Sequence, residues 1–118
     1  MRFSILIIFF LFLFTRLTGQ ALSNGAYKFK VAFDEWEGKS LGASCMVKIK
    51  GDSIVVINNG TLSGKKGEII ESGILRKHLK TGKWIITHHH SDVYAKAIGE
   101  CSGGPMVIDL KNKIVWLC

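Results

Sequence analysis

The sequence lacks an apolar run long enough to cross a membrane. Its longest one extends only over residues 4–14, whereas a spanning helix needs about 20 apolar residues. Arg16 ends the run, and no acid lies among residues 1–21. A short apolar stretch behind a positive charge is typical of a secretory signal peptide. Gly19 and Ala21 supply the small residues that a signal peptidase recognises, so we predict cleavage after Ala21.

Cysteine is absent from the predicted cleavage junction, so the sequence does not indicate a lipoprotein anchor. An uncleaved membrane anchor is the alternative to a signal peptide, and the shortness of the apolar run disfavours it. We therefore predict a signal peptide over residues 1–21 and a secreted or periplasmic location. Residues 22–118 are long enough for a single β-rich domain with one core.

Acidic residues are scarce. Residues 22–118 hold nine acids against 14 lysines and arginines, a net charge of +5. Six of the basic residues cluster along the sequence: Lys65, Lys66, Arg76, Lys77, Lys80 and Lys83. Such a cluster predicts attraction to an anionic surface, either lipid or acidic polysaccharide. A charged edge exposed to solvent is the alternative. Aromatic residues do not alternate with these charges, so we expect no nucleic-acid partner.

Only three cysteines are present: Cys45, Cys101 and Cys118. An odd number permits at most one internal disulfide, and three pairings are open. A hairpin predicted at the end of the chain would bring Cys118 back toward Met106, within reach of the flexible link that follows Cys101. We favour a Cys101–Cys118 disulfide, which would stabilise the fold by about 3 kcal/mol. Cys45 is then expected to be a buried apolar thiol.

The hydrophobic pattern has a period of two residues, which is typical of half-buried strands. No convincing internal repeat is present. About seven segments are predicted as strands: 27–33, 45–50, 53–58, 68–76 with a bulge at Gly73, 84–87, 106–110 and 114–118. Gly51-Asp52 and Asn59-Gly60 are hairpin signals between them. Sequential hairpins favour a meander that curls to bury its apolar face. We therefore predict a mostly β fold, a small antiparallel barrel or sandwich.

One short helix is predicted over residues 91–99. Ser91 is a suitable N-cap, Asp92 suits the positive end of the helix dipole, and Gly99 suits the end of the helix. Just before it, His88 and His90 would share one face of a strand. With Asp92 they form a candidate zinc or copper site. A solvated strand end is the alternative.

The segment Ser102-Gly103-Gly104-Pro105 resembles the nucleophile loop of chymotrypsin-like serine proteases. The resemblance implies Ser102 as a nucleophile, with a histidine from His88–His90 as its base. Cys101 is a second candidate nucleophile. However, Cys101 stands where that family has an aspartate, and the chain is too short for the family's two barrels. A small secreted hydrolase is therefore the alternative function.

Three tryptophans, Trp36, Trp84 and Trp116, are many large residues for one small domain. We expect them mainly in the core. Trp36 stands in a polar loop and is the best candidate to face a ligand. The favoured interpretation is an exported binding or envelope-associated module with no identifiable catalytic site.

Overall fold

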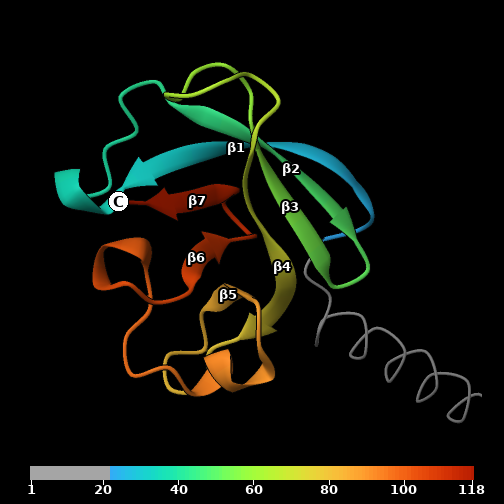
Figure 1. Ribbon diagram of the computed structural model, residues 1–118, viewed down its shortest axis with the longest axis vertical. Coiled ribbons are helices and arrows are strands. Elements are labelled where there is room, and N and C mark those ends of the chain that lie inside the picture. Colours follow the sequence, from blue (N-terminus) through green and yellow to red (C-terminus); the bar gives the residue numbers. More distant parts are fainter. Residues whose placement is uncertain (1–21) are drawn as a thin grey trace, which may run out of the picture.

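Seven strands, each paired with the next along the chain, form a single sheet (Figure 1). The computed structural model describes residues 22–118, so the predicted signal peptide lies outside the described residues. The strands are β1 (Gly25–Phe33), β2 (Ser44–Lys50), β3 (Ser53–Asn58), β4 (Ile69–Lys77), β5 (Trp84–Thr87), β6 (Met106–Asp109) and β7 (Ile114–Leu117). No helix in this part of the chain is long and apolar enough to cross a membrane.

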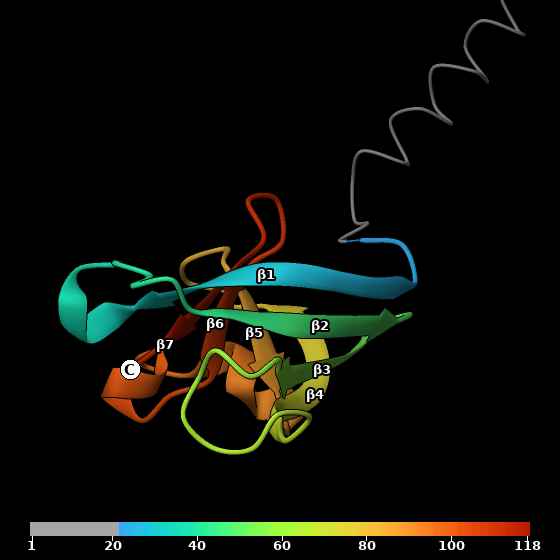
Figure 2. The ribbon, with the colours of Figure 1, turned by 90° about the horizontal axis from the view of Figure 1, so that it is seen from above.

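The sheet closes on itself to form a barrel. Successive strands from β1 to β7 pair antiparallel, as the hairpin signals predict. The closing pair is different, because β1 and β7 lie side by side and run in the same direction. Figure 2 shows β1, β2 and β3 one after another along one side of the barrel. The predicted small β-barrel is confirmed, and the parallel closure is a feature that we did not predict.

The period-two pattern accounts for the core. Alternate side chains on each strand point inward and are almost fully buried. They include Phe29, Val31, Val47, Val56, Ile86, Met106, Ile108 and Val115. Each large apolar side chain buried in this way contributes roughly 1.5–3 kcal/mol. Cys45 is one of these inward residues, and burial raises the pKa of its thiol to about 11. It is therefore an inert core residue, as predicted.

The long strand β4 joins two parts of the sheet. Its first half pairs with β3 and its second half with β5. The register shift in the first half places the extra residue at Ile70, so the bulge predicted at Gly73 was in the wrong position. Gly73 has another role. A Cβ atom there would collide with the carbonyl oxygen of Thr87, so the close approach of β5 requires glycine.

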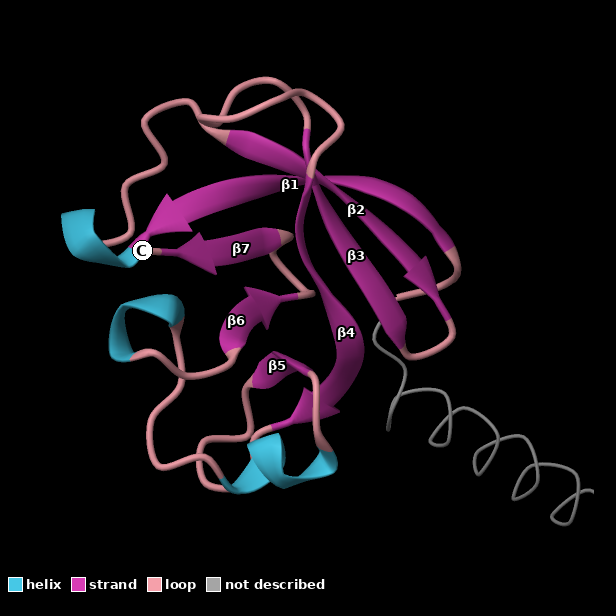
Figure 3. Cartoon of the chain, viewed as in Figure 1, coloured by secondary structure: helices cyan, strands magenta, loops and turns pink. Residues whose placement is uncertain are grey.

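Three short 3-10 helices lie outside the barrel: η1 (Asp34–Trp36), η2 (His90–Tyr94) and η3 (Glu100–Ser102) (Figure 3). The helix predicted over residues 91–99 exists only as η2, and its cap is His89 rather than Ser91. Ala95 leaves the helical conformation with ψ 138°. Its carbonyl oxygen accepts a hydrogen bond of 2.7 Å from Nε2 of the buried His78. The Ala95 carbonyl is thus bonded to a distant side chain and not to a further turn of the helix.

Candidate functional site

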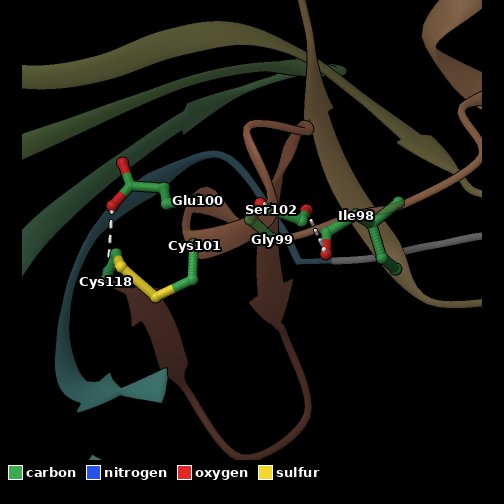
Figure 4. The surroundings of a disulfide bond; sticks show 6 residues. All are labelled: Ile98, Gly99, Glu100, Cys101, Ser102 and Cys118. Atoms are coloured by element: carbon green, nitrogen blue, oxygen red, sulfur yellow. Dashed lines mark hydrogen bonds between the residues drawn. A yellow bond between two sulfur atoms is a disulfide. The ribbon is translucent and has the colours of Figure 1, made fainter. Parts of the chain in front are cut away.

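The Cys101–Cys118 disulfide fastens the end of the chain to η3 (Figure 4). The two Cα atoms are 4.9 Å apart. The Cys118 N–H also donates to the Glu100 carboxylate at 3.1 Å. The predicted pairing is therefore present. It holds the segment before β6 against the end of β7, because η3 lies directly upstream of β6.

The two candidate nucleophiles lie in η3 without a base beside them. The Ser102 hydroxyl donates to the carbonyl oxygens of Gly99 at 2.7 Å and Ile98 at 3.0 Å, as Figure 4 shows. Cys101 is in the disulfide. Within residues 22–118, no histidine hydrogen-bonds to either side chain, although nucleophilic catalysis needs such a partner. The arrangement gives the hydrolase alternative no support.

The candidate metal ligands are occupied by other contacts. His88 Nε2 lies 2.7 Å from the Glu71 carboxylate, which raises the pKa of His88. The Asp92 carboxylate accepts the backbone N–H groups of His89 and His88, and these bonds lower the pKa of Asp92. His90 is exposed. Over residues 22–118, no three His, Cys, Asp or Glu side chains gather closely enough to hold a metal ion.

The predicted basic cluster is divided by β4. Lys65 and Lys66 lie in the loop before this strand, whereas the other four residues lie at its end or in the turn that follows. Two of those four have partners of their own. Arg76 donates to the Thr87 hydroxyl at 2.8 Å, and the Lys77 ammonium lies 5.3 Å from the centroid of the Trp84 ring. The six residues therefore do not form one continuous basic patch.

A cleft of about 480 Å³ opens against β5, β6 and β7. We call it the tryptophan cleft, because Trp84 on β5 and Trp116 on β7 both line it. Asp34 of η1 and the link Ile98–Gly99 before η3 complete its walls. The barrel thus brings together residues from the two ends of the domain.

Local backbone features position these walls. The Trp116 ring packs against Gly38, where an added Cβ would lie 3.1 Å from a ring carbon. Gly38 has φ 84°, a left-handed conformation that favours glycine. Gly99 has φ 99°, and its N–H donates to the Pro105 carbonyl oxygen at 2.7 Å. Gly99, two residues before the disulfide-bonded Cys101, therefore lines the cleft.

Charged side chains surround the cleft. The Asp109 carboxylate accepts the backbone and side-chain N–H groups of Asn112, both at 2.9 Å, and the backbone bond is the main cause that lowers the pKa of Asp109. Asp34, Lys83 and Lys111 also line the cleft. Their side chains form no hydrogen bond or ion pair with the described part of the chain. Within residues 22–118, one carboxylate and two ammonium groups at the cleft therefore have no hydrogen-bonded partner, and the charge of Lys111 acts on the nearby Asp109 carboxylate.

Trp36 occupies a separate apolar groove of about 510 Å³ near the C-terminus. Its ring packs edge-on against Phe33, with the centroids 5.0 Å apart, and the residue is 47% exposed. The sequence pointed to Trp36 as the ligand-facing tryptophan, whereas Trp84 and Trp116 were expected in the core. Those two are half-buried and both line the cleft, and Trp84 also packs against the hydrophobic core as expected. That both tryptophans line the same cleft depends on how distant strands are arranged in the sheet, which the residue pattern alone does not reveal.

Comparisons with protein-family models, with curated proteins and with solved structures found no match to this chain.

Proposed function

We propose that this chain is an exported binding module and that its ligand occupies the tryptophan cleft. The observation that carries the proposal is that Trp84 and Trp116 line one cleft together with the charged side chains of Asp34, Lys83 and Lys111, which have no hydrogen-bonded partner within residues 22–118. Its volume lies in the usual range for small-ligand sites, about 300–1,000 Å³. The ligand class that fits is a small molecule with an apolar ring face and a polar edge, because indole rings offer both an apolar face and an N–H donor.

Two further features support export. The apolar run near the start of the chain has the length of a signal-peptide core. The Cys101–Cys118 disulfide is compatible with an extracellular or periplasmic compartment, where such bonds persist.

The three tryptophans allow a direct test, because two lie in the cleft and Trp36 lies outside it. We would label residues 22–118 with ¹⁵N, assign the three indole N–H signals by Trp→Phe variants, and add monosaccharides, nucleosides and aromatic acids in turn. We expect at least one of these probes to move the Trp84 and Trp116 signals and leave the Trp36 signal in place. The proposal would be contradicted if the probes moved only the Trp36 signal, or if no probe moved any of the three signals.

A further inference from the structure

A second surface of the barrel carries positive charge only. The strands β1, β2 and β3 contain four lysines and no acid. Lys28 and Lys30 lie on β1, Lys48 and Lys50 lie on β2, and all four side chains are exposed. We call them the lysine face. None of them belongs to the basic cluster that the linear sequence suggested.

Strand register places these lysines together. Lys28 is opposite Met46 on β2, so Lys48 lies diagonally across from it, two residues further along. Diagonal neighbours on a sheet are about 7–8 Å apart at Cα, so these like charges repel one another. The described residues form one ion pair, between His88 and Glu71, and the lysine face takes no part in it. The repulsion is therefore not relieved within the described part of the protein.

The need to protect a sheet edge does not explain all four of these lysines. Edge strands often carry lysine to prevent pairing with another sheet. Here, however, Lys48 lies on β2 between β1 and β3, and Lys30 lies where β1 is paired with both β2 and β7, so among these positions only the first half of β1, with Lys28, is an edge. An external anion is the partner that would relieve the repulsion.

The side chains between the lysines indicate which anion. Met46, Val55 and Ile57 share the outer face of these strands and are half-exposed. The aromatic residues of β1, including Tyr27 and Phe29, belong to the core or pack against it, so the outer face offers no ring on which a sugar could stack. Ammonium groups alternating with short apolar side chains suit a lipid headgroup layer better than an acidic polysaccharide.

We propose that the lysine face docks the domain onto a membrane surface rich in anionic lipid. The contact is peripheral, made by the four ammonium groups with lipid phosphates. The tryptophan cleft lies against β5, β6 and β7, whereas docking uses β1 and β2, so the two sites belong to different strands. This inference goes beyond the proposed ligand binding and does not depend on it.

The test is vesicle sedimentation of residues 22–118. The wild-type domain is expected to bind vesicles of phosphatidylglycerol and phosphatidylcholine in equal parts, to release them as salt is raised, and not to bind pure phosphatidylcholine. The variant with Lys28, Lys30, Lys48 and Lys50 all changed to Gln is expected to bind more than about tenfold more weakly, since each lysine near the surface contributes to attraction.

A charge-matched control variant distinguishes the effect of the lysine face from the effect of a lower net charge. Changing Lys65, Lys66, Lys80 and Lys96 to Gln removes the same charge from exposed positions elsewhere. We expect this control variant to lose less than about twofold in affinity, because screening limits distant charges. Equal losses in the two variants, no binding to the anionic vesicles, or retention by immobilised alginate without vesicle binding would each overturn the proposal. Circular dichroism of both variants shows whether the barrel remains folded.

Discussion

His78 links two segments outside the barrel and is only 2% exposed. Its Nε2 donates to the Ala95 carbonyl, and its Nδ1 lies 2.9 Å from the Thr81 hydroxyl. We expect His78→Ala to lower the free energy of unfolding by about 2–4 kcal/mol, because it removes the partner of the half-buried Ala95 carbonyl and opens a cavity where the buried imidazole lay. Urea unfolding followed by circular dichroism measures this loss. His90→Ala is the control, since that exposed side chain forms no hydrogen bond within residues 22–118. An equal loss of stability in this control would contradict the stabilising role that we give to the hydrogen bonds of His78.

The exposed contact of His88 with Glu71 predicts a pH dependence of stability. The Glu71 carboxylate raises the pKa of His88, so the stabilisation is fully present below pH 6.5, the ordinary pKa of histidine. It is lost as pH rises through the folded-state pKa. Because His88 is 57% exposed, we expect a loss below about 1 kcal/mol. Urea midpoints between pH 5.5 and pH 8.5 should fall more for the wild type than for His88→Gln, and identical falls would show that the contact contributes nothing.

Some single-residue features could be predicted because they depend on local pattern. Cys45 falls on the inward parity of its strand, and the terminal hairpin brings Cys118 back toward Cys101. The tryptophan cleft could not be predicted in this way. Trp84 and Trp116 lie on strands that are not neighbours, and Asp34 joins them from the other end of the domain. Only the three-dimensional closure of the sheet brings these three side chains to the same cleft.

The Cys101–Cys118 disulfide stabilises the fold by holding η3 against the end of β7. Changing Cys101 and Cys118 to Ser together should lower the free energy of unfolding by about 3 kcal/mol, as expected for a loop of 17 residues. Reducing the wild-type protein should lower its urea midpoint to that of the variant and leave the variant unchanged. Unequal midpoints after reduction would mean that the Ser side chains, rather than the missing bond, alter stability. Cys45 is fully buried and is not expected to react in the folded state.

Strand β4 depends on Gly73, where β5 passes closest. We expect Gly73→Ala to destabilise the fold by about 1–3 kcal/mol, because the new methyl group overlaps the Thr87 carbonyl oxygen and the strands must separate. Ser72→Ala on the same strand is the control, since Ser72 is exposed, and it should change stability by less than about 0.5 kcal/mol. Thermal melting of both variants gives the comparison. Equal melting temperatures would show that the sheet accommodates a side chain at residue 73.

The boundaries of individual elements were predicted less well than their types. The residues from Ser91 to Gly99 carry helix-start and helix-end signals, yet η2 ends at Tyr94. The carbonyl of Ala95, which a longer helix would use, is instead held by His78 from another part of the chain. The bulge is at Ile70 rather than Gly73 for a similar reason, because strand pairing determines its place. Contacts between distant segments therefore outweighed local signals in both cases.

The parallel direction of the closing pair in the barrel follows from the number of strands. In a meander each strand reverses the direction of the one before it, so the first and seventh strands must run the same way. A closed sheet of seven such strands therefore requires one parallel pair, which is the observed pairing of β1 with β7. The sequence pattern predicted the number of strands, and the parallel closure could have been derived from it.

That closing pair makes the barrel dependent on its last strand. Val115 and Leu117 of β7 belong to the core, and their loss would also leave β1 and β6 as unpaired edges. We expect a chain ending at Lys113 to lose cooperative thermal unfolding and the dispersed amide signals of a folded domain. Cys118→Ser in the full-length domain removes the disulfide but keeps β7, so it should still melt cooperatively at a lower temperature. A truncated chain that unfolds as sharply as this control would mean that β1 to β6 form a stable open sheet without closure.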